Sequence, residues 1–329
     1  MKDLKSDFKA KNFKSVYLLH GDEPYMIRHY LGEFTKLTTD SMMNSDSFEG
    51  KDFSISSAID AAETFPFLSD YRLVFIKDSG LCASGRKDDS EAMAKYLPNV
   101  PEGTIIVFSE SAIDKRNRLY KQISTTGRVV ECSIPAESEL LRWLANIFKK
   151  KGKEIDTQTA RILLATVPKG MDSLYAEADK LEAFLGERTK ITAEDIATVC
   201  TKSLEARIFD LVGALCSGET ENALHLYHNM LIMKEQPLMM LAMMARQFRL
   251  VLQCKVCSEK GVRDIAGTLN LRDFIVRECV KQGQNFSSSR LVSALTDCQD
   301  TDLRIKTGLM EAELGVELLI VRYSICQQF

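Results

Sequence analysis

The segment around Gly21 stands where a phosphate-binding loop would lie in a nucleotide-binding domain. The apolar run at residues 16–20 predicts a buried strand, and Asp22, Glu23 and Pro24 after the glycine are typical of a helix start. Nucleotide-binding loops join a strand to a helix in this way and follow the pattern G-x-x-x-x-G-K-[ST]. Their glycine amides cradle the phosphates, and the lysine and hydroxyl reach the terminal phosphate and Mg²⁺.

The turn keeps one glycine of that pattern and lacks the rest. Between Asp22 and His29 there is no second glycine, no lysine, and no serine or threonine. The carboxylates of Asp22 and Glu23 would also repel a phosphate. We interpret the segment as a nucleotide-binding scaffold that has lost its nucleotide, and we expect no cofactor. An ordinary strand-to-helix turn of an α/β domain has the same pattern and is the alternative.

A second segment is apolar where turn chemistry predicts polar residues. Phe65, Pro66, Phe67 and Leu68 stand between a predicted helix at residues 54–62 and a predicted strand. Apolar side chains gathered in an exposed turn indicate an anchor for a partner's pocket. The alternative is that the turn folds back and caps the sheet, and the residues alone favour neither.

Other reactive residue types lack the spacing that catalysis or metal binding needs. Cys254 and Cys257 form the only C-x-x-C pair, whereas a structural zinc site needs about four ligands, so we expect core packing inside a helix. The four histidines have no metal-binding spacing, and no serine or cysteine nucleophile motif occurs. The methionine-rich residues 230–244 have helical spacing, which favours core over an adaptable binding surface. We therefore assign no metal site and no catalytic site.

Composition limits where the protein works and what it binds. The 329 residues have a formal net charge of −3, which excludes nucleic-acid binding through bulk positive charge. Nine scattered cysteines, an odd number, suit reduced thiols, and neither a signal peptide nor a run of about 18 apolar residues occurs, so we expect a cytoplasmic protein. Three groups of basic residues are more typical of solvated helix faces than of DNA contacts: Arg142 with residues 149–153, Arg246 with Arg249 and Lys255, and Arg304 with Lys306.

The elements that would position these residues change character along the chain. In the first 136 residues we predict strands at 16–20, 43–48, 72–76, 104–108 and 128–133, and helices at 25–37, 54–62, 88–97 and 115–124. This alternation indicates a parallel sheet covered by helices. Continuous apolar runs such as residues 105–108 are typical of strands buried on both faces.

After Pro135 the pattern becomes helical. We predict helices at 140–148, 157–166, 173–185 and 193–199, and longer ones at 205–216, 219–233, 238–258, 271–282, 287–302 and 308–323, with residues 302–308 joining the last two. Residues 204–329 carry 14 Lys and Arg against 15 Asp and Glu. This balance favours a helical assembly domain over a basic nucleic-acid module.

Four segments in this order make the sequence resemble the delta subunit family of the bacterial clamp loader, part of DNA polymerase III. They are Y-L-L-H-G-D-E-P-Y at residues 17–25, F-P-F-L-S-D-Y-R-L-V at 65–74, D-K-R-N-R-L-Y-K at 114–121, and the join at 302–308. The resemblance spans nearly the whole chain. It implies an AAA+ type α/β domain at residues 1–136, a small helical lid at 137–203 and a helical collar at 204–329.

The resemblance also implies a function. Members of the family bind and open the sliding clamp (the beta subunit) for loading onto primed DNA, without binding ATP themselves. Their partners are the ATPase clamp-loader subunits, delta-prime and primer–template DNA. The family's hydrophobic clamp-binding pair maps by position to Pro66 and Phe67, with Leu68 adjacent, so a proline stands at the first position. Such a chain has no catalytic site of its own, although the DNA polymerase III holoenzyme is a DNA-directed DNA polymerase, a nucleotidyltransferase. The alternatives are an AAA+ ATPase and a helical adaptor unrelated to the clamp.

Overall fold

The structure is a computed structural model, and it describes residues 2–38, 41–269, 271 and 273–324. The chain divides into two compact units, residues 1–160 with 169–191 and residues 161–168 with 192–329. The predicted helical lid contributes residues to both units. The three-domain division therefore stays a prediction.

A five-stranded parallel sheet forms the centre of the first unit. Its order is β2 (Ser45–Glu49), β3 (Arg72–Lys77), β4 (Thr104–Glu110), β1 (Val16–His20) and β5 (Arg128–Glu131). Every residue of β1 and β4 is buried. Continuous apolar runs form these central strands because both of their faces are covered, as the sequence predicted.

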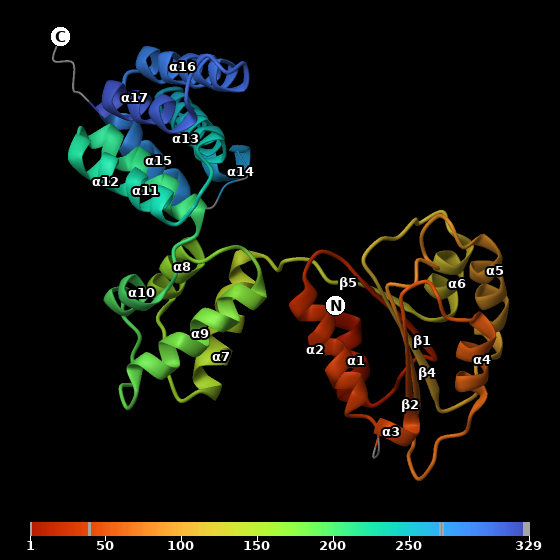
Figure 1. The fold of residues 1–329 in the computed structure, drawn as a ribbon. Coiled ribbons are helices and arrows are strands. Elements are labelled where there is room, and N and C mark those ends of the chain that lie inside the picture. The colour runs from red at the N-terminus through yellow and green to blue at the C-terminus, as the bar shows by residue number, and fades with distance from the viewer. Residues whose placement is uncertain (1, 39–40, 270, 272, 325–329) are drawn as a thin grey trace. The chain divides into compact units, whose positions relative to one another are not determined.

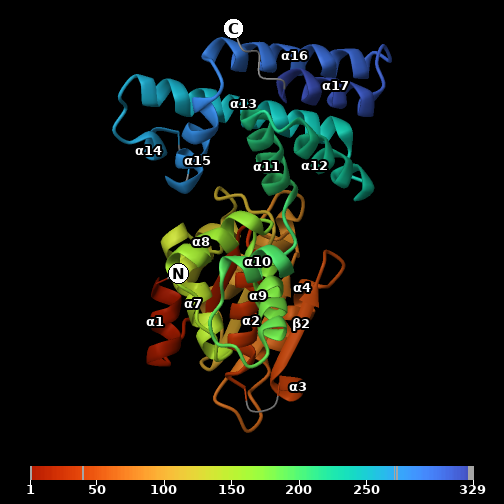
Figure 2. The same cartoon turned by 90° about the vertical axis from the view of Figure 1, so that its left-hand side faces the viewer.

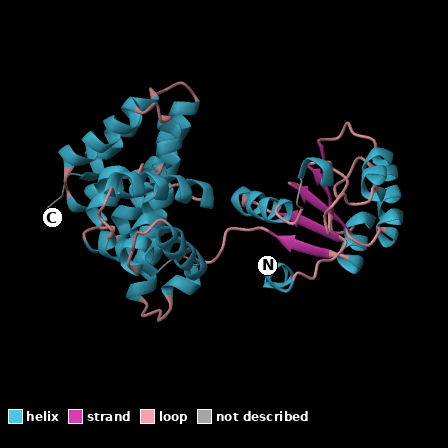
Figure 3. Cartoon of the chain, turned by 90° about the horizontal axis from the view of Figure 1, so that it is seen from below, coloured by secondary structure: helices cyan, strands magenta, loops and turns pink. Residues whose placement is uncertain are grey.

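Helices cover both faces of this sheet. Figure 1 shows α4 (Ile55–Glu63), α5 (Lys87–Tyr96) and α6 (Arg118–Thr126) on one face, and α1 (Lys2–Ala10) and α2 (Pro24–Thr35) on the other. The same layering is visible along the strands in Figure 3. On the α1 side, the ring of Phe34 lies 4.9 Å from the rings of both Phe8 and Tyr17.

Two predictions for this unit are wrong in detail, and one helix was not predicted. Helix α1 has no counterpart among the predicted elements. The strand predicted from residue 43 begins at Ser45, because residues 41–44 form the short helix α3 (Ser41–Asn44). The helix predicted from residue 115 begins at Arg118, because the Asn117 side chain accepts hydrogen bonds from Leu119 N and Tyr120 N and thereby caps it.

The lysine-rich run, residues 149–153, stands at the end of one helix of the first unit and contacts a second helix. Helix α7 (Glu137–Lys150) ends at these residues, and α9 (Met171–Leu185) lies beside it. Lys151 forms ion pairs with Asp179 at 2.7 Å and Glu182 at 2.5 Å, and buried Lys153 donates to the carbonyl oxygens of Gly186 and Arg188. The interpretation of this run as a solvated face is therefore wrong for these two lysines, which fasten α7 to the end of α9. Helix α8 (Thr157–Thr166) spans the limit between the units.

The second unit is helical. It contains α10 (Ala193–Val199), α11 (Leu204–Ser217), α12 (Thr220–Ile232), α13 (Pro237–Glu259), α14 (Ile265–Leu269), α15 (Asp273–Gln284), α16 (Ser288–Lys306) and α17 (Ala312–Ser324). The long α13 packs against α11, α15, α16 and α17, and Figure 2 shows it beneath α16 and α17. Its core includes Leu211, Tyr227 and Phe248, all almost fully buried. None of the helices among the described residues has the length and apolar character needed to cross a membrane.

The structure corrects two predictions for the second unit. Residues 302–306 are the last turn of α16 and not part of a join, because Gly308, with φ of 75°, lies just beyond the end of the helix. The last helix begins at Ala312 and not at residue 308 as predicted. In the methionine-rich segment, Met230, Met240 and Met244 are buried as predicted, but Met233 and Met239 are exposed. The helix predicted from residue 271 is seen from Asp273, and Arg272 lies outside the described residues.

Candidate partner-binding site

The apolar turn, residues 65–68, projects its side chains into solvent. Phe65, Phe67 and Leu68 are 82%, 57% and 83% exposed, and Pro66 is half-buried. The turn joins the end of α4 to the start of β3 and does not fold back over the sheet. Three large apolar side chains next to one another in water are unfavourable unless a partner covers them.

Buried polar groups bond to this turn and to the elements at its two ends. The side chain of Asn44 makes two hydrogen bonds with the backbone of Phe67. Arg72, the first residue of β3, is buried, donates to the carbonyl oxygens of Ala61 at 3.1 Å and Met43 at 2.6 Å, and forms an ion pair with Asp46. The end of α4, the end of α3 and the start of β2 are thus joined by one guanidinium.

The turn also contains an unusual backbone conformation. Leu68 has a φ of 50°, in the left-handed region that residues with a side chain rarely adopt. This conformation costs about 1–2 kcal/mol. Such a strained conformation persists only where the surrounding structure stabilises it. The exposed turn is therefore ordered by its contacts with the rest of the domain. Sequence reasoning found the apolar residues but missed Asn44, which it assigned to a strand, and Met43, which is 58% exposed.

The turn around Gly21 is closed by the backbone that follows β5. Gly21 has a φ of 135°, and a Cβ atom there would lie 2.3 Å from the carbonyl oxygen of Cys132. That same oxygen accepts a hydrogen bond from Glu23 N at 3.0 Å, and Cys132 N donates to the carbonyl oxygen of His20 at 2.6 Å. The backbone at this turn is therefore already engaged within the chain.

The carboxylate of Glu23 lies where two helices begin. Glu23 is 1% exposed; its Oε1 accepts from Tyr25 N at 3.2 Å in the first turn of α2, and its Oε2 accepts from Met171 N at 3.1 Å at the start of α9. Helix N-termini favour an anion because their amides are unpaired and their dipole is positive there. In this protein the anion at both helix starts is a side chain of the chain itself.

Further contacts tie α9 to α2 around this carboxylate. Arg28 of α2 forms an ion pair with Asp172. The ring of Tyr25 lies 5.4 Å from that of Trp143 and 5.7 Å from that of Tyr175. The segment that could have held a nucleotide is thus packed by aromatic rings and one internal carboxylate.

The motif at residues 114–121 has an architectural role. The Asn117 side chain accepts from Leu119 N at 2.7 Å and donates to the carbonyl oxygens of Leu81 and Ala83 at 3.0 and 3.2 Å. It thereby joins the start of α6 to the loop after β3. Asp114 pairs with exposed Arg116, whose hydrogen bonds lower the pKa of that carboxyl.

Buried titratable groups at the same edge of the sheet also support loops. Glu110, 2% exposed, accepts from Ser79 N and Gly80 N, and burial raises its pKa despite these hydrogen bonds. Burial lowers the pKa of His20, at the end of β1.

Cys254 is buried in the helical core as predicted, and Cys257 is half-buried. Within the described residues, no three His, Cys, Asp or Glu side chains are grouped as a metal site would require.

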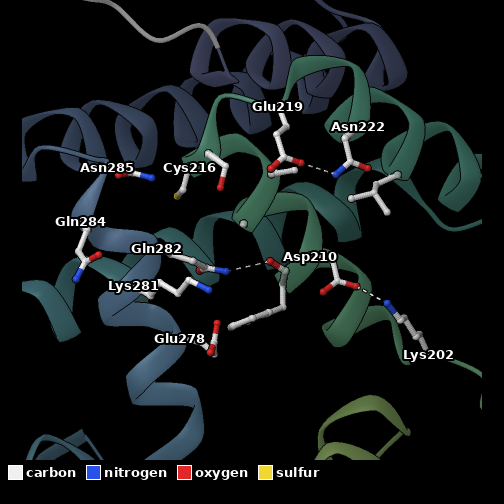
Figure 4. Close-up of a pocket in the computed structure, with 15 residues that line it drawn as sticks. Lys202, Asp210, Cys216, Glu219, Asn222, Glu278, Lys281, Gln282, Gln284 and Asn285 are labelled. Carbon is white, nitrogen blue, oxygen red and sulfur yellow. Dashed lines mark hydrogen bonds and ion pairs between the residues drawn. The ribbon is translucent and has the colours of Figure 1, made fainter. Parts of the chain in front are cut away.

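A polar cavity of about 560 Å³ lies in the second unit, between α11, the start of α12 and the end of α15. Figure 4 shows that several of its polar side chains interact with one another or with the cavity wall. Lys202 pairs with Asp210 at 2.8 Å, Asn222 donates to Glu219 at 2.8 Å, and Gln282 donates to the carbonyl oxygen of Phe209 at 3.2 Å. Nothing among these contacts points to a particular ligand, and we assign the cavity none.

Comparison with known proteins gives one family over most of the chain. Residues 17–133 match the family model described as DNA polymerase III, delta subunit, and residues 205–323 match the model described as DNA polymerase III delta subunit, C-terminal domain. The DNA polymerase III subunit delta of Bacillus subtilis (strain 168) is 26% identical over 332 residues, which cover 97% of this chain and 96% of that protein.

The solved structure of the Bacillus subtilis DNA clamp loader delta protein (YqeN) is similar in fold. It has a TM-score of 0.59 and 26% sequence identity, and the match covers 98% of this chain and 99% of that chain. The parallel-sheet domain is of the AAA+ type and is followed by helical regions, as the sequence resemblance implied. The chain therefore belongs to the family of DNA polymerase III delta subunits, which are subunits of the clamp loader.

Proposed function

We propose that this protein binds and opens the sliding clamp for loading onto primed DNA, and that the apolar turn is the clamp-binding element. The observation that carries this proposal is the exposure of Phe65, Phe67 and Leu68 on a turn that buried polar groups hold in place. Family membership supports the same role. Pro66 stiffens the turn, while the two residues after it supply the apolar contact.

Binding at the turn can open the clamp only if its affinity differs between the open and the closed clamp. Burying a Phe and a Leu contributes about 1.5–3 kcal/mol each. This free energy favours the open clamp only when the turn binds the open form more tightly than the closed form. The role proposed for this chain is therefore to stabilise an open clamp, without a chemical step of its own.

We further propose that the chain does this without binding ATP. The Cys132 carbonyl lies against Gly21 and accepts a hydrogen bond from Glu23 N, and the buried carboxylate of Glu23 occupies the start of α2. A phosphate would have to displace that carboxylate and would meet its charge. ATP bound by other loader subunits would then control access to the apolar turn.

The helical second unit is proposed to hold the chain in a cytoplasmic loader with ATPase subunits and delta-prime, around primer–template DNA. Its exposed apolar residues Leu309, Leu314 and Leu318 suit packing against the helices of other subunits. Its near-neutral charge balance leaves DNA contact to local groups.

The clamp proposal is tested with Phe67→Ala/Leu68→Ala in the full chain. Removing exposed anchors should lower affinity for the organism's sliding clamp by about thirtyfold or more and leave the melting temperature unchanged. Phe184→Ala/Leu303→Ala removes the same residue types from other exposed positions, 50% and 61% exposed, and should leave clamp affinity unchanged.

Two results would count against the proposal. Clamp affinity equal to that of the control variant means that the clamp binds elsewhere. A large fall in melting temperature means that the turn supports the fold, since truncating a buried Phe costs about 3–5 kcal/mol. In the same samples a fluorescent ATP analogue should not bind saturably at micromolar concentration.

A further inference from the structure

One buried polar side chain lies behind the apolar turn. Asn44 has no exposed surface, and its carboxamide both accepts from and donates to the backbone of a single residue. Its Oδ1 accepts from Phe67 N at 2.6 Å, and its Nδ2 donates to Phe67 O at 2.9 Å. A neighbouring β-strand would pair with Phe67 in the same two-bond manner. A side chain thus takes the place of a strand.

This pairing needs a donor and an acceptor on one short planar group. A carboxamide has both, a carboxylate at neutral pH has only acceptors, and an alkyl side chain has neither. Asn44 is itself fixed, because it lies directly before β2 and because the carbonyl oxygen of its neighbour Met43 accepts from Arg72 at 2.6 Å. The hold on Phe67 is therefore anchored in the sheet.

The pairing decides where the exposed side chains point. With the Phe67 backbone fixed, Leu68 is kept at its positive φ, and the side chains of Phe65, Phe67 and Leu68 stay in solvent. An unheld turn with three large apolar side chains would bury them against each other or against the sheet. A turn held in its binding conformation loses less entropy when a partner covers it.

We propose that Asn44 is a positioning residue for clamp binding, which presets the apolar turn by pairing with the backbone of Phe67. This inference rests on the proposed function, because the clamp is the partner. Asn44 is buried and acts through Phe67, so substitution at this position leaves the contacting side chains in the sequence unchanged.

The test uses Asn44→Ala and Asn44→Asp in the full chain. Asn44→Asp keeps the size and the acceptor but loses the donor, so it carries the test if Asn44→Ala does not fold. Both should weaken clamp binding by about tenfold or more, since several side chains must then be ordered on binding. Hydrogen exchange at the Phe67 amide should become faster in the free protein.

The matched control is Asn117→Ala. Asn117 is also an asparagine that bonds backbone groups, Leu81 O and Leu119 N, but at the opposite edge of the same sheet. It should destabilise the unit without changing clamp affinity. A control that loses clamp affinity as much as Asn44→Ala would overturn the inference, because both effects would then reflect general destabilisation.

A second background separates positioning from support of the fold. In Leu68→Ala, part of the anchor is gone, so Asn44→Ala should have a smaller effect on clamp affinity than in the unmodified chain. Equal effects in both backgrounds overturn the inference. If the unmodified chain does not bind the clamp, the proposed function fails, and exchange at Phe67 still tests the hold by Asn44. If it binds and both Asn44 variants bind equally well, the inference fails and the proposed function stands.

Discussion

Replacement of Glu23 by alanine should loosen two helix starts at once. The carboxylate is buried and accepts hydrogen bonds from Tyr25 N at 3.2 Å and Met171 N at 3.1 Å. Loss of one helix cap typically costs about 1 kcal/mol, and hydrogen bonds to charged groups contribute about 1.5–3 kcal/mol. Removing a buried charge also recovers part of its desolvation cost. The free energy of unfolding of the first unit should therefore fall by about 2–4 kcal/mol.

The two units need not unfold together, so a single urea transition does not say which unit is destabilised. Hydrogen exchange is therefore measured as well, because it reports on each helix separately. Exchange should become faster in the first turn of α9, starting at Met171, and in the first turn of α2, and should be unchanged in α13. Glu23→Gln keeps one acceptor oxygen but places an N–H group against a backbone N–H donor. Its free energy of unfolding should therefore also fall measurably.

The control is Glu33→Ala, within α2. Glu33 pairs with exposed Lys36 at 2.6 Å, and such surface pairs contribute at most about 1 kcal/mol. If Glu23→Ala unfolds at the same urea concentration as Glu33→Ala and exchange at the start of α9 is unchanged, Glu23 does not join the two helices.

Two other substitutions test the same edge of the sheet. Gly21→Ala should lower the free energy of unfolding in urea by more than about 1 kcal/mol, because its Cβ would lie 2.3 Å from Cys132 O and its φ is 135°. The control Gly32→Ala, in α2, has nothing within 4 Å of its Cβ and should be neutral or slightly stabilising. Equal effects of the two substitutions would contradict the close approach at Gly21. Burial lowers the pKa of His20 below 6.5, so the unfolded chain binds the proton more readily and stability should fall as pH drops below about 6.5. His20→Gln should reduce that loss between pH 7.5 and 5.5, and an unchanged pH dependence would refute the assignment.

Local patterns were enough to predict the sheet. β1, β3 and β4 are buried on both faces, so each is a continuous apolar run. Such a run can be recognised in the sequence without knowledge of its neighbours in the fold. Helix α1 was not predicted, although Leu4 and Phe8 stand four residues apart, as on one face of a helix. Two large apolar residues among its nine are too short a pattern to identify a helix by spacing alone. Its fully buried Leu4 and half-buried Phe8 are separated by charged residues, and its packing against Phe34 is a long-range contact.

The candidate site was predictable only in part, for the same reason. Phe65, Phe67 and Leu68 stood out because apolar residues are unexpected in a turn. Asn44 did not, because its role depends on a contact with Phe67 23 residues later in the chain. Glu23 was placed at a helix start and interpreted as repelling phosphate, but its second partner, Met171, lies 148 residues away and could not be predicted.

The parallel sheet places the apolar turn and the Gly21 turn at opposite edges. The first precedes β3 and the second follows β1, so strands such as β3, six residues of about 3.3 Å each, keep them about 20 Å apart. Substitutions at this distance have additive effects on stability. A substitution in the turn around Gly21 should therefore leave the positions of Phe67 and Leu68 unchanged. The two ends of the sheet can thus change independently of each other.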